Sequence, residues 1–181
     1  MSTSAPSPRI APVASPDDEQ AALLAKTLLT KDGRPLNLFA TLAHNPLLLK
    51  RFNALGGFFL RHGELPDRER ELVILRVAVR TGSRYEHAQH VVIGRQVGLS
   101  DAEIAQVSGP LDAWPDDDRT LLRFVDEMVD SDGSDVTTWA SLEARYTQSQ
   151  MLELSLLVGF YRMLAAFLVV VGVQIEGEQT D

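Results

Sequence analysis

The chain has 181 residues, 45% of them hydrophobic and 23% charged, which suits one soluble globular domain. The formal net charge is -8 and acidic residues interrupt the short basic runs, so nucleic-acid binding is not expected. The absence of cysteine excludes disulfides, thiolate nucleophiles, cysteine-ligated zinc and iron–sulfur clusters.

The amino-terminal residues predict a flexible arm. Residues 1–16 are rich in Ser, Pro and Ala, and they lack the basic start and apolar stretch of a secretory signal. A single domain over residues 17–176 and a short tail over residues 177–181 complete the predicted organisation. A cytoplasmic location is expected by default.

Helical spacing of apolar residues dominates the sequence after the arm. The segments begin at capping residues or Pro and end at Gly or Pro. No alternating strand pattern of convincing length is present. The sequence therefore predicts an all-α domain of about seven to nine helices. The predicted segments cover residues 19–29, 38–42, 46–63, 68–82, 84–97, 101–107, 116–131 and 136–146, and a long final helix that begins near Gln148.

The final helix raises the question of membrane insertion. Residues 154–175 are long enough to span a bilayer, but Tyr161 and Arg162 fall near their middle. A charge there costs about 2.5–3.5 kcal/mol in lipid. The uninterrupted apolar part, residues 163–173, is too short to span. Burial in a protein core or a subunit interface is the better explanation, and no membrane partner is expected.

Residues 83–90 hold the first candidates for chemistry. Ser83 and Glu86 form an S-x-x-E pattern, which predicts a reciprocal capping box and fully explains both residues. His90 follows Glu86 by four residues, so both project from one helix face. A Glu–His pair can carry out general acid–base catalysis, and it is also a common surface pair. The spacing leaves both interpretations open.

The metal-binding signal of this segment is weak. His87 and His90 are three residues apart, but no third ligand is marked, and the order E-H-x-x-H is not that of zinc proteases. The sequence also lacks a glycine-rich phosphate loop and a G-x-S-x-G elbow. No metal and no cofactor are expected.

Glu71 stands at the start of an almost wholly apolar run, L-V-I-L-R-V-A-V. Its carboxylate can simply complement the helix dipole. If this helix is central, Glu71 is instead partly buried, with a raised pKa suited to proton transfer.

Several of these motifs occur together in a known order. Residues 65–107 contain L-P-x-R-x-R-E-L, a small-residue turn, Y-E-x-x-x-H and G-L-S-x-x-E-I, and residues 37–52 and 158–176 agree as well. In this combination the chain resembles the carboxymuconolactone decarboxylase family, which includes the AhpD-type alkylhydroperoxidases. The resemblance implies an all-helical AhpD-like fold that oligomerises through helices, usually as a homotrimer or a homohexamer.

The resemblance also implies roles for individual positions. The peroxidase branch uses C-x-x-C followed by histidine, but Ser83 and Glu86 stand at the cysteine positions, so a thiol peroxidase is not expected. Glu71, Tyr85 and His90 remain, as in the cysteine-free branch. His87 stands where many relatives are expected to have an aromatic residue.

The expected function is therefore a cofactor-free, decarboxylase-like lyase. It would use general acid–base proton transfer on a small carboxylated lactone or a related carbonyl acid. His90 would be the proton donor or base, held by Glu71 or Glu86, and Tyr85 would hydrogen-bond a developing enolate. The expected catalytic residues are His90, Glu71, Tyr85 and Glu86, and the expected substrate-binding residues are Arg76, His87 and Ser83.

Two other functions stay open at this point. One is a non-catalytic helical scaffold or a small-molecule binding protein of the same fold. The other is metal-assisted hydrolysis through His87, His90 and Glu86.

Overall fold

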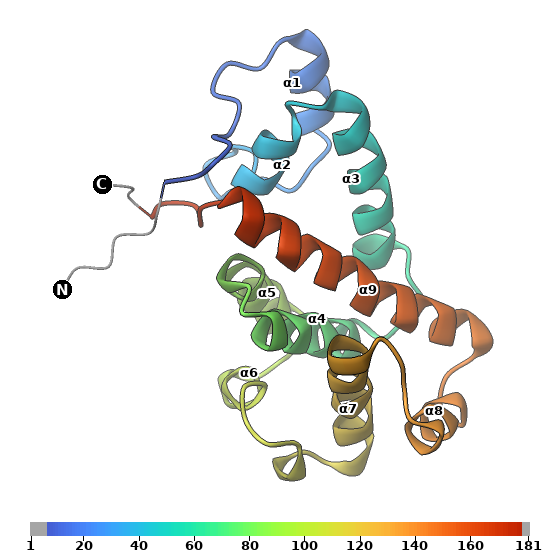
Figure 1. The fold of residues 1–181 in the computed structure, drawn as a ribbon. Coiled ribbons are helices and arrows are strands. Elements are labelled where there is room, and N and C mark those ends of the chain that lie inside the picture. Colours follow the sequence, from blue (N-terminus) through green and yellow to red (C-terminus); the bar gives the residue numbers. More distant parts are fainter. Residues whose placement is uncertain (1–6, 179–181) are drawn as a thin grey trace, which may run out of the picture. The chain divides into compact units, whose positions relative to one another are not determined.

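The computed structural model describes residues 7–178, and within that range it contains nine α-helices, one short 3-10 helix and no strand (Figure 1). This confirms the predicted all-α class. The chain divides into two compact units, residues 1–61 with 167–181, and residues 62–166. Each unit is described by itself, and the single domain over residues 17–176 stays a prediction.

The first unit contains three helices and the end of the chain. Its helices are α1 (Asp18–Leu24), α2 (Asn37–Leu42) and α3 (Pro46–Arg61). The first helix ends five residues earlier than predicted, because the chain turns back there. Thr30 N donates to Arg34 O at 2.7 Å, and an isolated bridge joins Leu29 to Pro35.

Part of the predicted arm is hydrogen-bonded within this unit. Arg9 N donates to Val171 O at 2.8 Å, and Val13 N donates to Ala40 O at 3.1 Å. The flexibility of residues 1–16 stays a prediction. Residues 1–6 of the arm and residues 179–181 of the tail lie outside the described residues.

The second unit carries the motifs that the sequence singled out. Its central helix, α4 (Asp67–Thr81), is buried from Glu71 to Ala78, because neighbouring helices pack along it (Figure 1). The predicted capping box of Ser100 and Glu103 is confirmed at the start of a short helix. The elements are α4 (Asp67–Thr81), α5 (Arg84–Gln96), α6 (Asp101–Gln106), η1 (Leu111–Ala113), α7 (Asp116–Ser131), α8 (Val136–Glu143) and most of α9 (Gln148–Val171).

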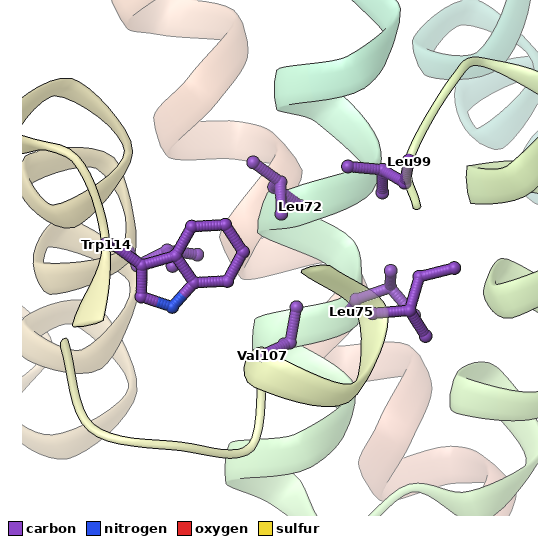
Figure 2. Close-up of a cluster of buried hydrophobic side chains, with 7 residues drawn as sticks. Leu72, Leu75, Leu99, Val107 and Trp114 are labelled. Atoms are coloured by element: carbon purple, nitrogen blue, oxygen red, sulfur yellow. The ribbon is translucent and has the colours of Figure 1, made fainter. Parts of the chain in front are cut away.

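A cluster of apolar side chains fixes α4 in place (Figure 2). Leu72 and Leu75 of α4 are completely buried, and Trp114 packs against them from the segment before α7. Burial of each such side chain stabilises the fold by roughly 1.5–3 kcal/mol. Leu72, a member of this cluster, comes directly after Glu71 in α4. Packing of the cluster therefore fixes the backbone next to this carboxylate. Its members are Leu72, Leu75, Leu99, Ile104, Val107, Trp114 and Leu122.

Among the described residues, α9 is the one helix long and apolar enough to cross a membrane, with a mean hydropathy of 2.2 in its most apolar window. Half of that window is buried in the protein, and core helices of soluble proteins pass the same test. Arg162, near its middle, donates to Met128 O at 3.1 Å and pairs with Asp132. The lack of a membrane partner stays a prediction.

Candidate active site

The candidate site lies on the hairpin that α4 and α5 form. Gly82 ends α4 in the left-handed conformation with φ +68°, which glycine adopts without the steric cost that other residues incur. Ser83 N then donates to Ala78 O at 2.8 Å, which closes the turn. As a result α5 runs back beside α4, and the buried faces of both helices meet (Figure 1).

A buried Glu–His pair joins the two helices. The Glu71 side chain is fully buried, and its Oε2 lies 2.7 Å from Nδ1 of His90. Its Oε1 accepts a hydrogen bond from Nε of Arg70 at 2.9 Å, and Arg70 also pairs with Asp67. A carboxylate held in this way directs the Nδ1 proton of the imidazole toward itself. Nε2 of His90 is then the ring nitrogen available for proton exchange.

Tyr161 of α9 completes the surroundings of this pair. Its ring meets the His90 ring edge to face, with centroids 5.0 Å apart and an angle of 86° between the planes. Burial raises the pKa of Tyr161 well above its ordinary value, and the charges of Glu71 and Glu86 act in the same direction. The Tyr161 phenol therefore stays protonated and uncharged next to the His90 ring. In the sequence Tyr161 is only an interruption of the apolar run, and no spacing pattern assigns it to the site.

Ser83 and Glu86 do not form the predicted capping box. Ser83 precedes the first residue of α5, but its side chain makes no capping hydrogen bond. Both residues are 98% buried, and neither Ser83 Oγ nor the carboxylate oxygens of Glu86 make a hydrogen bond of good geometry with a protein group. Burial raises the pKa of Glu86 to about 8, and the nearby Ser83 hydroxyl offsets part of this rise. The capping prediction was wrong, because the structure buries both side chains.

The other predicted site residues are placed differently. Tyr85 is buried in the first turn of α5, whereas His87 is only partly buried. Arg76 is buried on α4, where its Nε and Nη2 bind both carboxylate oxygens of Asp126 at 2.7 and 2.6 Å. Its Nη1 donates to Val107 O at 2.5 Å. These bonds occupy most of the guanidinium, so the geometry favours a structural role for Arg76 over substrate binding.

A cavity of about 320 Å³ lies elsewhere in the second unit. Its lining is mainly apolar, and it includes none of the predicted site residues. The lining residues are Phe124, Met128, Gly133, Ser134, Val136, Trp139 and Ser155. Over residues 7–178, no group of three or more His, Asp or Glu side chains is arranged to hold a metal ion.

The family assignment follows from the segment that builds this site. The model of the carboxymuconolactone decarboxylase family matches residues 46–123. This segment therefore resembles the carboxymuconolactone decarboxylase family. The matched region includes all of α4 and α5, and so it contains Glu71, Ser83, Glu86 and His90. No curated protein matches the sequence significantly.

Solved structures show that the whole chain has an AhpD-like fold. An uncharacterised peroxidase-related protein from Silicibacter sp. TM1040 is 17% identical, with a TM-score of 0.80, and the match covers 98% of this chain and 94% of that one. A putative antioxidant defence protein AhpD from Agrobacterium tumefaciens is 22% identical, with a TM-score of 0.66 and coverage of 76% and 96%. The debrominase Bmp8 is 15% identical, with a TM-score of 0.76 and coverage of 93% and 92%. The TM-scores show that these proteins share the fold of this chain, and identities this low show nothing beyond the fold.

Proposed function

We propose that the chain is a cofactor-free enzyme that transfers a proton next to a carbonyl group, with His90 as the acid–base residue. The observation that carries this proposal is the 2.7 Å contact between Nδ1 of His90 and Oε2 of the fully buried Glu71. An imidazole that is oriented by a carboxylate and leaves one nitrogen for the substrate is a common arrangement in general acid–base catalysis.

Each neighbour of His90 has a definite task in this proposal. Glu71 fixes the tautomer and the orientation of the ring, and Arg70 in turn holds Glu71. The edge-to-face contact of Tyr161 also restricts rotation of the imidazole. The two contacts with the His90 ring come from α4 and α9, so the ring is held from outside its own helix.

The proposed substrate is a small carboxylated lactone or a related carbonyl acid. In a decarboxylation the bond to the carboxyl carbon breaks, carbon dioxide leaves, and the electron pair moves into the conjugated carbonyl. Nε2 of His90 then delivers a proton to a carbon of the resulting enolate, and the ring takes a replacement proton from solvent. The match of residues 46–123 to the model of the carboxymuconolactone decarboxylase family supports this substrate class. The fold alone does not select it, because the structural neighbours include a debrominase and peroxidase-related proteins.

Thiol peroxidase chemistry is not part of the proposal. The positions that correspond to the redox cysteines of the peroxidase branch hold Ser83 and Glu86, and the chain has no cysteine. A non-catalytic scaffold of the same fold is the alternative. The burial of a charged or titratable set made up of Arg70, Glu71, Glu86 and His90 speaks against it, because such groups are costly to bury in a fold that does not use them.

We also propose that the enzyme is a cytoplasmic homotrimer or homohexamer that assembles through α9. Leu152, Leu156 and Met163 are 68, 62 and 55% exposed, and the exposed small residues Gly159 and Ala166 continue the same spacing. Steps of four, three, four and three residues keep all five on one helix face. Such an apolar stripe is typical of a surface that another helix covers.

The test of the catalytic proposal is carbon dioxide release from carboxymuconolactone by the wild type and by His90→Gln. The substitution removes the titrating group and keeps a side chain of similar length. Wild-type turnover with a loss of 10²-fold or more in the variant supports the proposal. Equal turnover by the two proteins, or no turnover by the wild type on carboxymuconolactone and simpler unsaturated lactone acids, contradicts it.

A further inference from the structure

Three buried polar side chains lie along one face of α5. Ser83, Glu86 and His90 occupy positions i, i+3 and i+7, which fall on the same side of a helix. They are 2, 2 and 6% exposed. His90 is engaged by Glu71, but Ser83 Oγ and the carboxylate oxygens of Glu86 make no hydrogen bond of good geometry with a protein group, although the Ser83 hydroxyl is close enough to Glu86 to lower its pKa. The polar atoms of Ser83 and Glu86 are therefore available to bind a ligand.

Leaving such groups unpaired is costly. A buried polar atom without a partner costs roughly 1–3 kcal/mol, so structures rarely keep several together without a use for them. Capping would have satisfied both side chains locally, as it does for Ser100 and Glu103 at the start of α6. At α5 the same sequence pattern is not used for capping. The contrast between the two helices indicates that Ser83 and Glu86 serve something other than helix termination.

The donors of this pair point to an anionic ligand. A hydroxyl and a protonated carboxyl each offer one O–H group, and both belong to the amino-terminal end of a thirteen-residue helix, whose dipole favours negative charge. Glu86 also lies near enough to Tyr161 to influence it, as Glu71 does. Glu86 is also one helical turn before His90 on the same face of α5, and His90 contacts Glu71.

We propose that the Ser83 hydroxyl and the Glu86 carboxyl together form an oxyanion-binding site, which receives an enolate or carboxylate oxygen of the substrate. The inference rests on the proposed function and deepens it, since His90 would exchange the proton and this pair would bind the developing negative oxygen. Neutral O–H donors of this kind stabilise a developing negative charge through hydrogen bonds.

The experiment measures binding of 4-nitrophenolate, an oxyanion whose visible absorption differs from that of the neutral phenol. The wild type is expected to bind the phenolate form. Ser83→Ala and Glu86→Met each remove one donor and should weaken binding by roughly ten- to a hundred-fold, which is the range for hydrogen bonds to a charged group. Glu86→Gln keeps an N–H donor and should bind better than Glu86→Met.

Two variants serve as controls, and a third distinguishes the binding proposal from the catalytic proposal. Ser141→Ala and Glu143→Met make the same changes at exposed positions of α8 and should leave phenolate binding unchanged. His90→Gln should keep phenolate binding while it loses turnover, so failure of the catalytic proposal and failure of the binding proposal give different results. Because neither Ser83 nor Glu86 makes a side-chain hydrogen bond of good geometry with a protein group, their variants should remain folded by thermal melting. Binding by Ser83→Ala and Glu86→Met equal to that of the wild type, or no binding by the wild type, overturns the inference.

Discussion

Glu71 and His90 stand nineteen residues apart in the sequence, yet Oε2 of one lies 2.7 Å from Nδ1 of the other. The contact exists because the turn at Gly82 folds α5 back along α4. Both residues are buried, so the pair is shielded from bulk water. The electrostatic interaction between them is therefore stronger than it would be in water. The mechanism proposed for this chain depends on that single relationship.

Replacing Glu71 by Gln should impair catalysis while the protein stays folded. The amide keeps the shape of the side chain but can present an N–H group to Nδ1, which would favour the wrong imidazole tautomer. Turnover of carboxymuconolactone should fall by about 10²-fold or more, with a smaller change in KM. The check is steady-state kinetics alongside circular dichroism; a kcat within twofold of the wild type would show that Glu71 does not orient His90.

Glu86 should make the stability of the protein depend on pH in an unusual direction. Its pKa is about 8 in the folded protein and close to 4.5 in an unfolded chain, so between these values only the folded state holds the proton. The free energy of unfolding should therefore fall as the pH rises from about 4.5 to about 8, by as much as roughly 4–5 kcal/mol. Below this window the group contributes no pH dependence.

Urea unfolding of the wild type and of Glu86→Gln at several pH values measures this effect. The variant cannot ionise at position 86, so this component of the slope should disappear, and it should be the more stable protein near pH 8. Parallel curves for the two proteins across the window would mean that Glu86 is not held protonated by burial.

Arg76 should matter for folding more than for substrate binding. Arg76→Met leaves Asp126 without its bidentate partner, and removing one member of a buried ion pair costs roughly 3–5 kcal/mol. Arg95→Met is the matched control, because the Arg95–Asp101 pair is exposed and should contribute less than about 1 kcal/mol. Chemical denaturation compares the two variants. A large rise in KM for Arg76→Met at unchanged stability would restore Arg76 as a substrate-binding residue.

The exposed stripe on α9 should control the oligomeric state. Leu156→Glu places a charge in its middle, where burial against another subunit would be unfavourable. Light scattering should give the mass of a trimer or hexamer for the wild type and a smaller mass for the variant. Val136→Glu, at an 81% exposed apolar residue of α8, should keep the wild-type mass. An oligomer that survives Leu156→Glu unchanged would place the interface elsewhere.

The sequence was sufficient for the fold class because helical periodicity and end signals are local properties. The long helix after Gln148 and the capping box at Ser100 are both confirmed. The first helix was predicted too long, since the bridge between Leu29 and Pro35 that ends it involves residues on both sides of a turn. Apolar spacing alone does not show such a bridge.

Only part of the candidate site can be predicted from the sequence. His90 and Glu71 were both singled out, but Glu86 was an equal candidate as the partner of His90, because helix spacing favours it. The choice depends on how two helices pack, which is tertiary information. The same limit explains why Ser83 was assigned to a cap and why Tyr161, seventy-one residues after His90, was not assigned to the site.

The most direct test of the proposed proton transfer is product formation from carboxymuconolactone in deuterium oxide, followed by mass spectrometry and proton NMR. The wild type should place one deuterium on a carbon of the enolate that forms when carbon dioxide leaves, and His90→Gln should form almost no deuterated product. Formation of the same labelled product at the same rate by both proteins would contradict the assignment of His90 as the residue that transfers the proton.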